Sequence, residues 1–341
     1  MRNGKYGCAV WGCGWVASGH INAYLKHPAC EIVGLGSRSL ASVEAKQREF
    51  GLQCRVYDDF DQILNDPSVD IISICTPNNQ HASEAIRAAQ AGKHIFVEKP
   101  MVIKADDIPV MLDAAASNRV RSLVAFILRF KPLVKLQKKL VSEGELGKVF
   151  MANVDYWFGR ERKGWMKHKE QTGGAFILAG CHSVDMARYI LDSDIVEVTA
   201  ANAMVGDYYE YPPVETAQVK FANGALGVFT CSLVGDVPYT ANLSILGEYG
   251  TIVNDQFYLR RFAGQKNFFT LDTGTKQSGD VYDHPFPEMV EHLIECIRED
   301  KESPHNLQSA VNSHLACIAI CTSAQQNGRK IVIEGSRLLY P

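Results

Sequence analysis

Short apolar runs alternate with helix-like segments along the first third of the chain. Residues 71–75 form an almost wholly apolar run, and a segment with alanine and isoleucine at helical spacing follows it over 78–91. Continuous apolar runs of this length are typical of strands buried on both faces of a parallel sheet. The pattern predicts strands over 6–11, 31–36, 71–75, 94–97 and 122–126, and helices over 18–26, 78–91 and 105–118.

The pattern changes after residue 149, where longer alternating runs follow one another with turns between them. The Asn223-Gly224 pair between two of these runs is a hairpin signal. Strands without intervening helices indicate an antiparallel sheet, so we predict a second, α+β domain from residue 126. Its expected strands cover 149–157, 195–204, 216–221, 227–233 and 240–246, and its expected helices cover 133–143, 180–191, 287–299 and 307–327.

A glycine-rich turn stands between the first predicted strand and the first predicted helix. It reads Gly12-Cys13-Gly14-Trp15-Val16-Ala17, a G-x-G-x-x-A pattern. The first glycine allows a tight turn, the second lets a pyrophosphate approach the backbone, and the small alanine lets the helix pack on the sheet. The helix N-terminus then faces the anion. The turn and its context predict a dinucleotide-binding domain, with residues 12–16 among the cofactor contacts.

The end of the second strand bears on the choice of cofactor. NAD-dependent enzymes commonly place Asp or Glu about 20 residues after the glycine motif, where the carboxylate binds the ribose 2′-hydroxyl. This chain has Ser37 there, followed by Arg38. No carboxylate repels a 2′-phosphate, and an arginine is available to bind it. This contrast favours NADP, while NAD stays open because an arginine also stacks on adenine.

Composition and charge point to no other class of partner. The net charge of −3 over 341 residues gives no electrostatic case for nucleic acid. No apolar run approaches the roughly 20 residues that span a bilayer. The ten cysteines are scattered without paired C-x-x-C spacing, so we expect reduced thiols and no metal site. The first strand follows the N-terminus without a signal-peptide pattern, which favours a cytoplasmic protein.

Three further segments carry candidate chemistry. Residues 76–81, Thr-Pro-Asn-Asn-Gln-His, follow a buried strand, and Glu98-Lys99-Pro100 follows the next strand. Ligands bind at the carboxyl ends of the strands in open α/β sheets. The third segment, residues 172–185, reads TGGAFILAGCHSVD. Together with the Arg129-Phe130 link, these segments resemble the glucose–fructose oxidoreductase and inositol dehydrogenase (Gfo/Idh/MocA) family over nearly the whole chain.

The resemblance implies a particular architecture and activity. A Rossmann NAD(P)-binding domain over 1–125 would precede a substrate-binding and oligomerisation domain over 126–341, an α+β domain with an open, mostly antiparallel sheet. The expected protein is an NAD(P)-dependent oxidoreductase that transfers a hydride between nicotinamide and a ring hydroxyl or ketone of a sugar, polyol or glycoside. It would act as a homo-oligomer, a dimer or a tetramer, without nucleic acid or membrane partners.

The resemblance also assigns roles to individual residues. Lys99 of the E-K-P motif would reach both nicotinamide and substrate, and His182 of the G-x-H motif would face the substrate hydroxyls. Both side chains suit the proton transfer that accompanies hydride transfer. The further expected cofactor contacts are Thr76, Pro77, Asn78, His81, Glu98 and Lys99. The expected substrate contacts are Lys99, Arg129, Tyr156, Trp165 and His182.

One position departs from the family's pattern. The family places an aspartate four residues before the histidine, and this chain has Leu178 there. A carboxylate that would orient His182 is therefore missing. Tyr156 or Asp155 are candidates to replace it, and Asp185 could orient His182 or serve a structural role.

Several alternatives remain open at this level. An NAD-dependent glycoside-cleaving enzyme of the same fold would oxidise the sugar transiently, and a non-catalytic dinucleotide-binding sensor would tolerate Leu178. The basic stretch 160–169 is a solvated loop or a substrate lid in which Trp165 stacks on a sugar ring. His284 could place an imidazole at the open face of the second domain.

Overall fold

The computed structural model describes residues 4–159, 164–274 and 279–340. The chain divides into two compact units, Met1–Ile127 with Asp280–Ala310, and Leu128–Gly279 with Val311–Pro341. The first change of unit lies two residues from the expected boundary at 125/126. Residues 280–310, expected in the second domain, group instead with the first unit.

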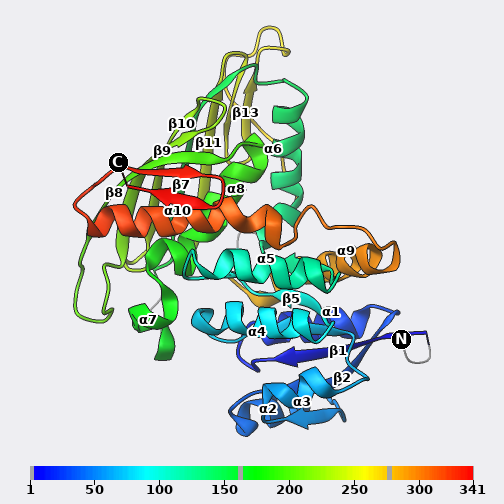
Figure 1. The fold of residues 1–341 in the computed structure, drawn as a ribbon. Helices are drawn as coiled ribbons and strands as arrows, with labels where there is room; N and C mark the ends of the chain where they lie inside the picture. Colours follow the sequence, from blue (N-terminus) through cyan, green and yellow to red (C-terminus); the bar gives the residue numbers. More distant parts are fainter. Residues whose placement is uncertain (1–3, 160–163, 275–278, 341) are drawn as a thin grey trace. The chain divides into compact units, whose positions relative to one another are not determined.

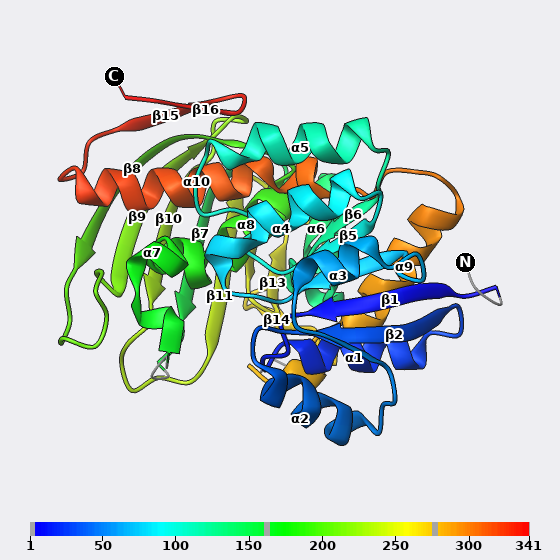
Figure 2. The ribbon, with the colours of Figure 1, turned by 60° about the horizontal axis from the view of Figure 1, so that its bottom comes forward.

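The first unit is built on a parallel sheet of six strands in the order β3-β2-β1-β4-β5-β6. Connections leave β1 in one direction and β4 in the other, so right-handed crossovers place α1 and α4 on opposite faces (Figure 2). The strands are β1 (Tyr6–Trp11), β2 (Cys30–Gly36), β3 (Arg55–Tyr57), β4 (Ile71–Ile74), β5 (His94–Val97) and β6 (Ser122–Val124). The helices are α1 (Ala17–Lys26), α2 (Leu40–Phe50), α3 (Phe60–Asn65), α4 (Asn78–Gln90), α5 (Asp107–Ser117) and α9 (Phe286–Arg298).

Helix α9 joins this unit through a strongly amphipathic face. Its buried residues recur at helical spacing, and they are Phe286, Met289, Val290, Leu293 and Ile294. α9 packs against α1 at Gly19, where a Cβ atom would lie 2.4 Å from the Phe286 ring. Glycine at this position therefore permits the close packing of the two helices.

The second unit is built on a sheet of ten strands in the order β14-β13-β12-β11-β7-β10-β9-β8-β15-β16. All neighbouring pairs are antiparallel except β7 and β10, which run parallel. The first five strands are β7 (Val149–Trp157), β8 (Ile195–Ala203), β9 (Val214–Phe221), β10 (Leu226–Ser232) and β11 (Thr240–Gly247). The shorter strands are β12 (Gly250–Val253), β13 (Gln256–Leu259), β14 (Phe269–Thr270), β15 (Ile331–Glu334) and β16 (Arg337–Leu339).

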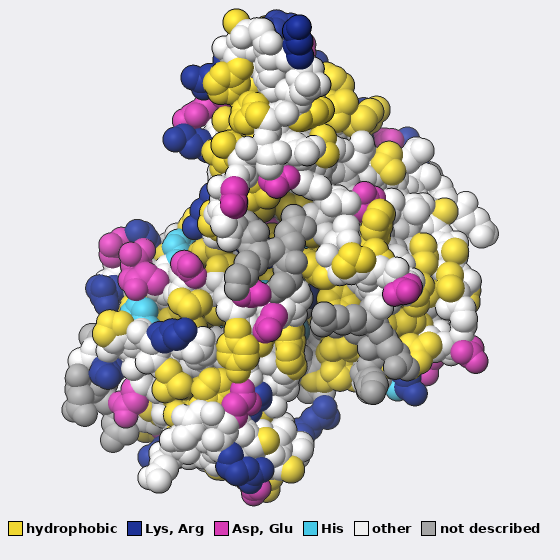
Figure 3. Space-filling view, turned by 180° about the vertical axis from the view of Figure 1, so that it is seen from behind, with side chains coloured by type: hydrophobic (Ala, Val, Ile, Leu, Met, Phe, Trp, Pro, Cys, Tyr) yellow, Lys and Arg dark blue, Asp and Glu magenta, His cyan; other side chains and the backbone are white. Residues whose placement is uncertain are grey.

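Helices cover one face of this sheet and leave the other open. Figure 1 shows α8 (Cys181–Leu191) and α10 (Leu307–Gln325) across the covered face, with α6 (Pro132–Ser142) packed against α8. Buried and exposed residues alternate along β9 and β10, as expected for a sheet with one solvated face. Figure 3 shows hydrophobic side chains reaching the surface among polar ones, and the exposed apolar residues include Phe150, Leu226 and Val228. The predicted open, mostly antiparallel sheet is confirmed.

The remaining predictions at this level concern cysteines and membranes. All ten cysteines lie in the described part of the chain and are free thiols, and nine of them are buried. Among the described residues, no helix combines the length and the apolarity needed to cross a bilayer.

Candidate active site

The glycine turn after β1 has the geometry that dinucleotide binding requires. Gly12 has φ +94°, and a Cβ atom there would lie 2.6 Å from the carbonyl carbon of Cys75. Any other residue would collide with the backbone after β4. A Cβ atom on Gly14 would meet no atom within 4 Å, so this backbone faces open space. With α1 starting at Ala17, the turn and the helix N-terminus suit a pyrophosphate.

The other expected residues of the turn differ in exposure. Cys13 is buried, and its thiol donates to the Gly36 carbonyl over 3.5 Å. Burial raises the pKa of this thiol to about 12, so Cys13 stays neutral beside the anion site. Trp15 is largely exposed, with 59% of its surface accessible, and Val16 precedes the first residue of α1. The turn therefore offers backbone amides and an exposed aromatic ring to a cofactor.

The residues expected at the adenosine end come together around the start of α4. Ser37 follows β2, and its hydroxyl accepts the Ser39 amide proton over 3.2 Å. Arg38 is exposed and reaches toward α4: with its amide oriented to satisfy both neighbours, Gln80 accepts from the guanidinium over 3.2 Å. The ends of β2 and β4 thus share one cluster of polar side chains.

A buried carboxylate, Glu84, supports this cluster from below. Trp11 Nε1 donates to Glu84 over 2.8 Å, and the Thr76 hydroxyl donates over 2.5 Å. Burial raises the pKa of Glu84 to about 7, against the opposing effect of these hydrogen bonds and of Arg38. Glu84 was not among the sequence candidates. It fixes Thr76, which was.

The E-K-P turn follows β5 and is held by a buried network. Glu98 accepts from the backbone amide of Lys99 over 3.2 Å and lies 3.0 Å from His20 Nε2. Burial raises the pKa of Glu98, but the hydrogen bond and charge of His20 and the charge of Lys99 outweigh it, so the pKa lies below its ordinary value. The His20 ring continues the network to Ser73 over 3.0 Å. Lys99 itself is half-buried at the carboxyl end of β5.

The Thr-Pro-Asn segment opens α4. Pro77 directly precedes the helix, and Asn78 is its first, buried residue. His81 is also buried, and both of its ring nitrogens lie 2.7 Å from backbone carbonyl oxygens, those of Pro100 and Thr76. His81 therefore contacts two loops at the ligand edge of the sheet rather than projecting from it.

In the second unit, His182 stands at the start of α8, directly after a π-helical turn, Phe176–Gly180. The Gly173-Gly174 pair before this turn has φ values of +86° and +137°. A Cβ atom on Gly174 would lie 2.8 Å from the sulfur of Cys321. His182 is 5% exposed, and its ring centroid lies 5.9 Å from that of Tyr156 on β7. The expected pairing of a tyrosine with His182 is thus present.

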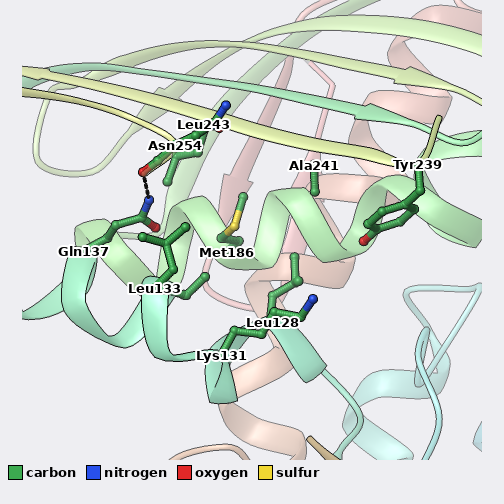
Figure 4. A pocket seen from close by; sticks show the side chains of 10 residues that line it. Leu128, Lys131, Leu133, Gln137, Met186, Tyr239, Ala241, Leu243 and Asn254 are labelled. Carbon is green, nitrogen blue, oxygen red and sulfur yellow. Dashed lines mark hydrogen bonds between the residues drawn. The ribbon is translucent and has the colours of Figure 1, made fainter. Parts of the chain in front are cut away.

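Tyr239, which sequence reasoning missed, extends this aromatic pair. Its ring meets Tyr156 edge-on with centroids 5.5 Å apart. Burial raises the pKa of Tyr239, and a hydrogen bond with Tyr156 opposes that effect. Figure 4 shows Tyr239 at one end of a small cavity of about 30 Å³ between the sheet and the helices α6 and α8. Gln137 lies at the other end and donates to the Asn254 carbonyl over 2.7 Å.

Leu178 lies within the π-helical turn and is buried, with 6% of its surface exposed. Asp155 does not replace the missing carboxylate on the same face, because side chains alternate along β7 and only Tyr156 points to the buried side. The Asp155 carboxylate instead accepts from Thr230 over 2.7 Å.

Asp185 and Arg129 form a buried ion pair. Arg129 donates to the two carboxylate oxygens over 2.7 Å and 2.5 Å, and the Ser313 hydroxyl donates to Asp185 over 2.7 Å. Arg129 is 3% exposed and also lies over the Tyr189 ring. The structure thus gives Asp185, a candidate for orienting His182, contacts that anchor α8. It gives Arg129, expected among the substrate contacts, a partner within its own unit.

We expect Asp185→Asn to lower the free energy of unfolding by about 3–5 kcal/mol, because it leaves a buried guanidinium without its counter-charge. Urea denaturation of the variant measures this effect. Glu143→Gln is the matched control, since it removes a partner of an exposed pair with Lys139 and exposed pairs contribute about 0–1 kcal/mol. A loss no larger than that of the control would contradict a stabilising role for the buried pair.

Two other expectations concern exposed segments. Residues 160–163 of the basic stretch lie outside the described residues, and Trp165 is half-buried in a short 3-10 helix, Gly164–Lys167. His168 pairs with Glu210 over 2.8 Å. The expectation for His284 was wrong: it belongs to the first unit, where its ring meets Trp15 of the glycine turn edge-on at 6.1 Å. The return of residues 280–310 to the first unit accounts for this difference.

Comparison with known proteins agrees with this geometry. Residues 6–126 match the model of the GFO_IDH_MocA oxidoreductase family with an NAD-binding Rossmann fold, and residues 134–253 match the model of the GFO/IDH/MocA C-terminal domain. The scyllo-inositol 2-dehydrogenase (NAD(+)) of Bacillus subtilis (strain 168) is 26% identical over 346 residues, which cover 97% of each protein.

Two further similarities concern enzymes that act on levoglucosan. The levoglucosan dehydrogenase of Pseudarthrobacter phenanthrenivorans is 29% identical over 59% of this chain and 58% of its own length. A solved structure of levoglucosan dehydrogenase with NADH and L-sorbose has a TM-score of 0.86 at 23% identity, and it covers 97% of this chain and 99% of that one. On these matches, the chain belongs to the Gfo/Idh/MocA family of oxidoreductases, with an NAD-binding Rossmann fold followed by the family's C-terminal domain.

Proposed function

We propose that this chain transfers a hydride between a nicotinamide cofactor and a ring hydroxyl or ketone of a sugar, polyol or glycoside. The observation that carries the proposal is the open backbone at Gly14 beside the obligatory glycine at 12, in a chain whose relatives include dehydrogenases of inositols and levoglucosan. Bound nicotinamide supplies the carbon that accepts or donates the hydride.

We assign the accompanying proton transfer to Lys99, with His182 as the residue that binds and orients the substrate hydroxyl. Lys99 lies at the carboxyl end of β5, the edge where ligands bind in such sheets. His182 is supported by the buried Tyr156 ring, which restricts its orientation. Thr76, Pro77, Asn78, His81 and Glu98 shape the loops around the cofactor, and Trp165 remains a proposed substrate contact.

A panel of sugars, inositols and glycosides, tested with both cofactors, checks this proposal through the absorbance of reduced nicotinamide. Net cofactor reduction with release of a ketone supports it. Aglycone release without net reduction would identify a glycoside-cleaving enzyme instead. Tight cofactor binding without turnover on the whole panel would identify a sensor.

We further propose that NADP is preferred over NAD. The support is the absence of a carboxylate at Ser37 and the position of the Arg38 guanidinium, which Gln80 holds near the start of α4. Arginine forms strong charge-assisted hydrogen bonds with phosphate. The names of two relatives mention NAD(+) or NADH, so the preference is a property to be tested on this chain.

Replacing Ser37 with aspartate should shift the preference toward NAD, because the new carboxylate repels the 2′-phosphate and binds the ribose hydroxyl. We expect the ratio of the two dissociation constants to change by about 10-fold or more, the scale of one charged hydrogen bond. Titration of both cofactors by intrinsic fluorescence measures it, and Ser42→Asp, in the first turn of α2, is the control. Tighter binding of NAD than of NADP by the unsubstituted protein would refute the NADP preference.

We also propose a homo-oligomer, supported by the exposed apolar residues on the open face of the second unit's sheet. Light scattering coupled to size exclusion determines the oligomeric state, and a monomer at micromolar concentration would contradict the proposal.

A further inference from the structure

His81 makes an unusual pair of contacts for a buried histidine. It lies in the first turn of α4 and is 1% exposed. Its Nδ1 atom lies 2.7 Å from the Pro100 carbonyl oxygen, and its Nε2 atom lies 2.7 Å from the Thr76 carbonyl oxygen. Both partners are backbone carbonyls, which accept hydrogen bonds and cannot donate them.

This geometry distinguishes between the protonation states of the ring. A neutral imidazole carries one N–H, so its other nitrogen would direct a lone pair at a carbonyl oxygen 2.7 Å away. Only the imidazolium donates to both carbonyls. His94 in the same unit shows the opposite arrangement, because its Nδ1 accepts from the backbone amide of Arg121 over 2.9 Å. An accepting ring nitrogen requires the neutral form.

The charges around His81 act in both directions. Burial is the largest influence and lowers the pKa of His81, and the charge of Lys99 acts in the same direction. The two carbonyl hydrogen bonds and the charge of Glu98 oppose it. Glu98 is itself a buried carboxylate of the E-K-P turn, so a buried cation on His81 would supply part of its counter-charge.

The two carbonyls belong to the two loops that carry the proposed cofactor and catalytic residues. Thr76 follows β4, which pairs with β5, and Pro100 follows Lys99 directly after β5. We infer that His81 is a doubly protonated imidazolium that ties the Thr76 loop to the Lys99 turn and so positions the Lys99 backbone. The positioning role rests on the proposed function of Lys99, whereas the protonation state does not.

Nitrogen-15 NMR of histidine-labelled protein tests the protonation state directly. At about pH 8, well above the ordinary pKa of histidine, we expect protons on both ring nitrogens of His81 and on only one nitrogen of His94. The His81→Gln and His81→Asn variants assign the signal by its disappearance, and either variant suffices if the other fails to fold. A single neutral tautomer of His81 at this pH would overturn the inference.

Steady-state kinetics test the positioning role. Glutamine can donate to one of the two carbonyls but not to both through ring nitrogens, so His81→Gln should lower kcat by roughly 10-fold, the scale of one charge-assisted hydrogen bond. The KM for the cofactor should change much less, because the glycine turn is untouched. His94→Gln is the matched control and should leave kcat unchanged. Unaltered kcat in His81→Gln would overturn the positioning role, while turnover by Lys99→Ala would instead refute the proposed function and leave the NMR result standing.

Discussion

Lys99→Ala should lower kcat by about 100-fold or more, the usual scale for removal of a general acid or base. The lysine stands at the carboxyl end of β5, in a turn that Glu98 holds through the Lys99 amide. Cofactor affinity should change little, because the pyrophosphate is bound by the turn at Gly12 and Gly14. Steady-state kinetics and a cofactor titration together separate the two effects.

Two further variants sharpen this experiment. Lys99→Arg keeps the positive charge but cannot give up a proton at neutral pH, so it should be nearly as inactive as the alanine variant. Lys104→Ala removes an exposed lysine five residues further along the chain and should keep full activity. If Lys99→Ala retained most of its turnover, the proton transfer would have to be assigned elsewhere, first to His182.

The first unit could be predicted well because its signals are local. The glycine turn, the apolar strands and the segment after β4 each carry their meaning within a few residues. The return of residues 280–310 could not be predicted in this way. It depends on the Phe286 ring packing where Gly19 leaves room, and these residues are far apart in the sequence. Nothing in the pattern of either helix names its partner.

The second unit shows the same limit in its sheet. The longer strands alternate clearly, and β7 begins and ends where the pattern predicted. The two-stranded pairing of β15 with β16 and the short strand β14 involve few residues each. Their positions are decided by neighbouring strands rather than by their own composition.

The candidate site divides along the same line. His182 and Lys99 stand in motifs, so they were identified, whereas Tyr239 and Glu84 carry no motif. Tyr239 reaches Tyr156 because β11 pairs with β7 in a register that sets Ala241 opposite Tyr156. The pairing of Asp185 with Arg129 likewise joins residues separated by 56 positions. Such contacts follow from tertiary packing, and only the structure reveals them.

His182→Ala should lower kcat by about 100-fold while the fold remains intact, if His182 binds the reacting hydroxyl without the family's aspartate. The reason lies in its surroundings: Leu178 is a buried apolar residue, and the aromatic ring of Tyr156 is the neighbour that restricts the imidazole. His182→Asn provides a second variant that leaves a smaller cavity. Kinetics on the best substrate of the panel, with urea denaturation in parallel, measure both consequences.

Leu178→Asn is the matched comparison, because it changes the same turn without touching the imidazole. It should lower the free energy of unfolding by about 1–3 kcal/mol, the cost of burying an amide without partners, and should leave kcat within a few-fold. Near-normal kcat in His182→Ala would mean that the histidine lost its role together with the missing carboxylate. The substrate hydroxyl would then have to be bound by the hydroxyls of Tyr156 and Tyr239, and Tyr156→Phe would become the variant that abolishes turnover.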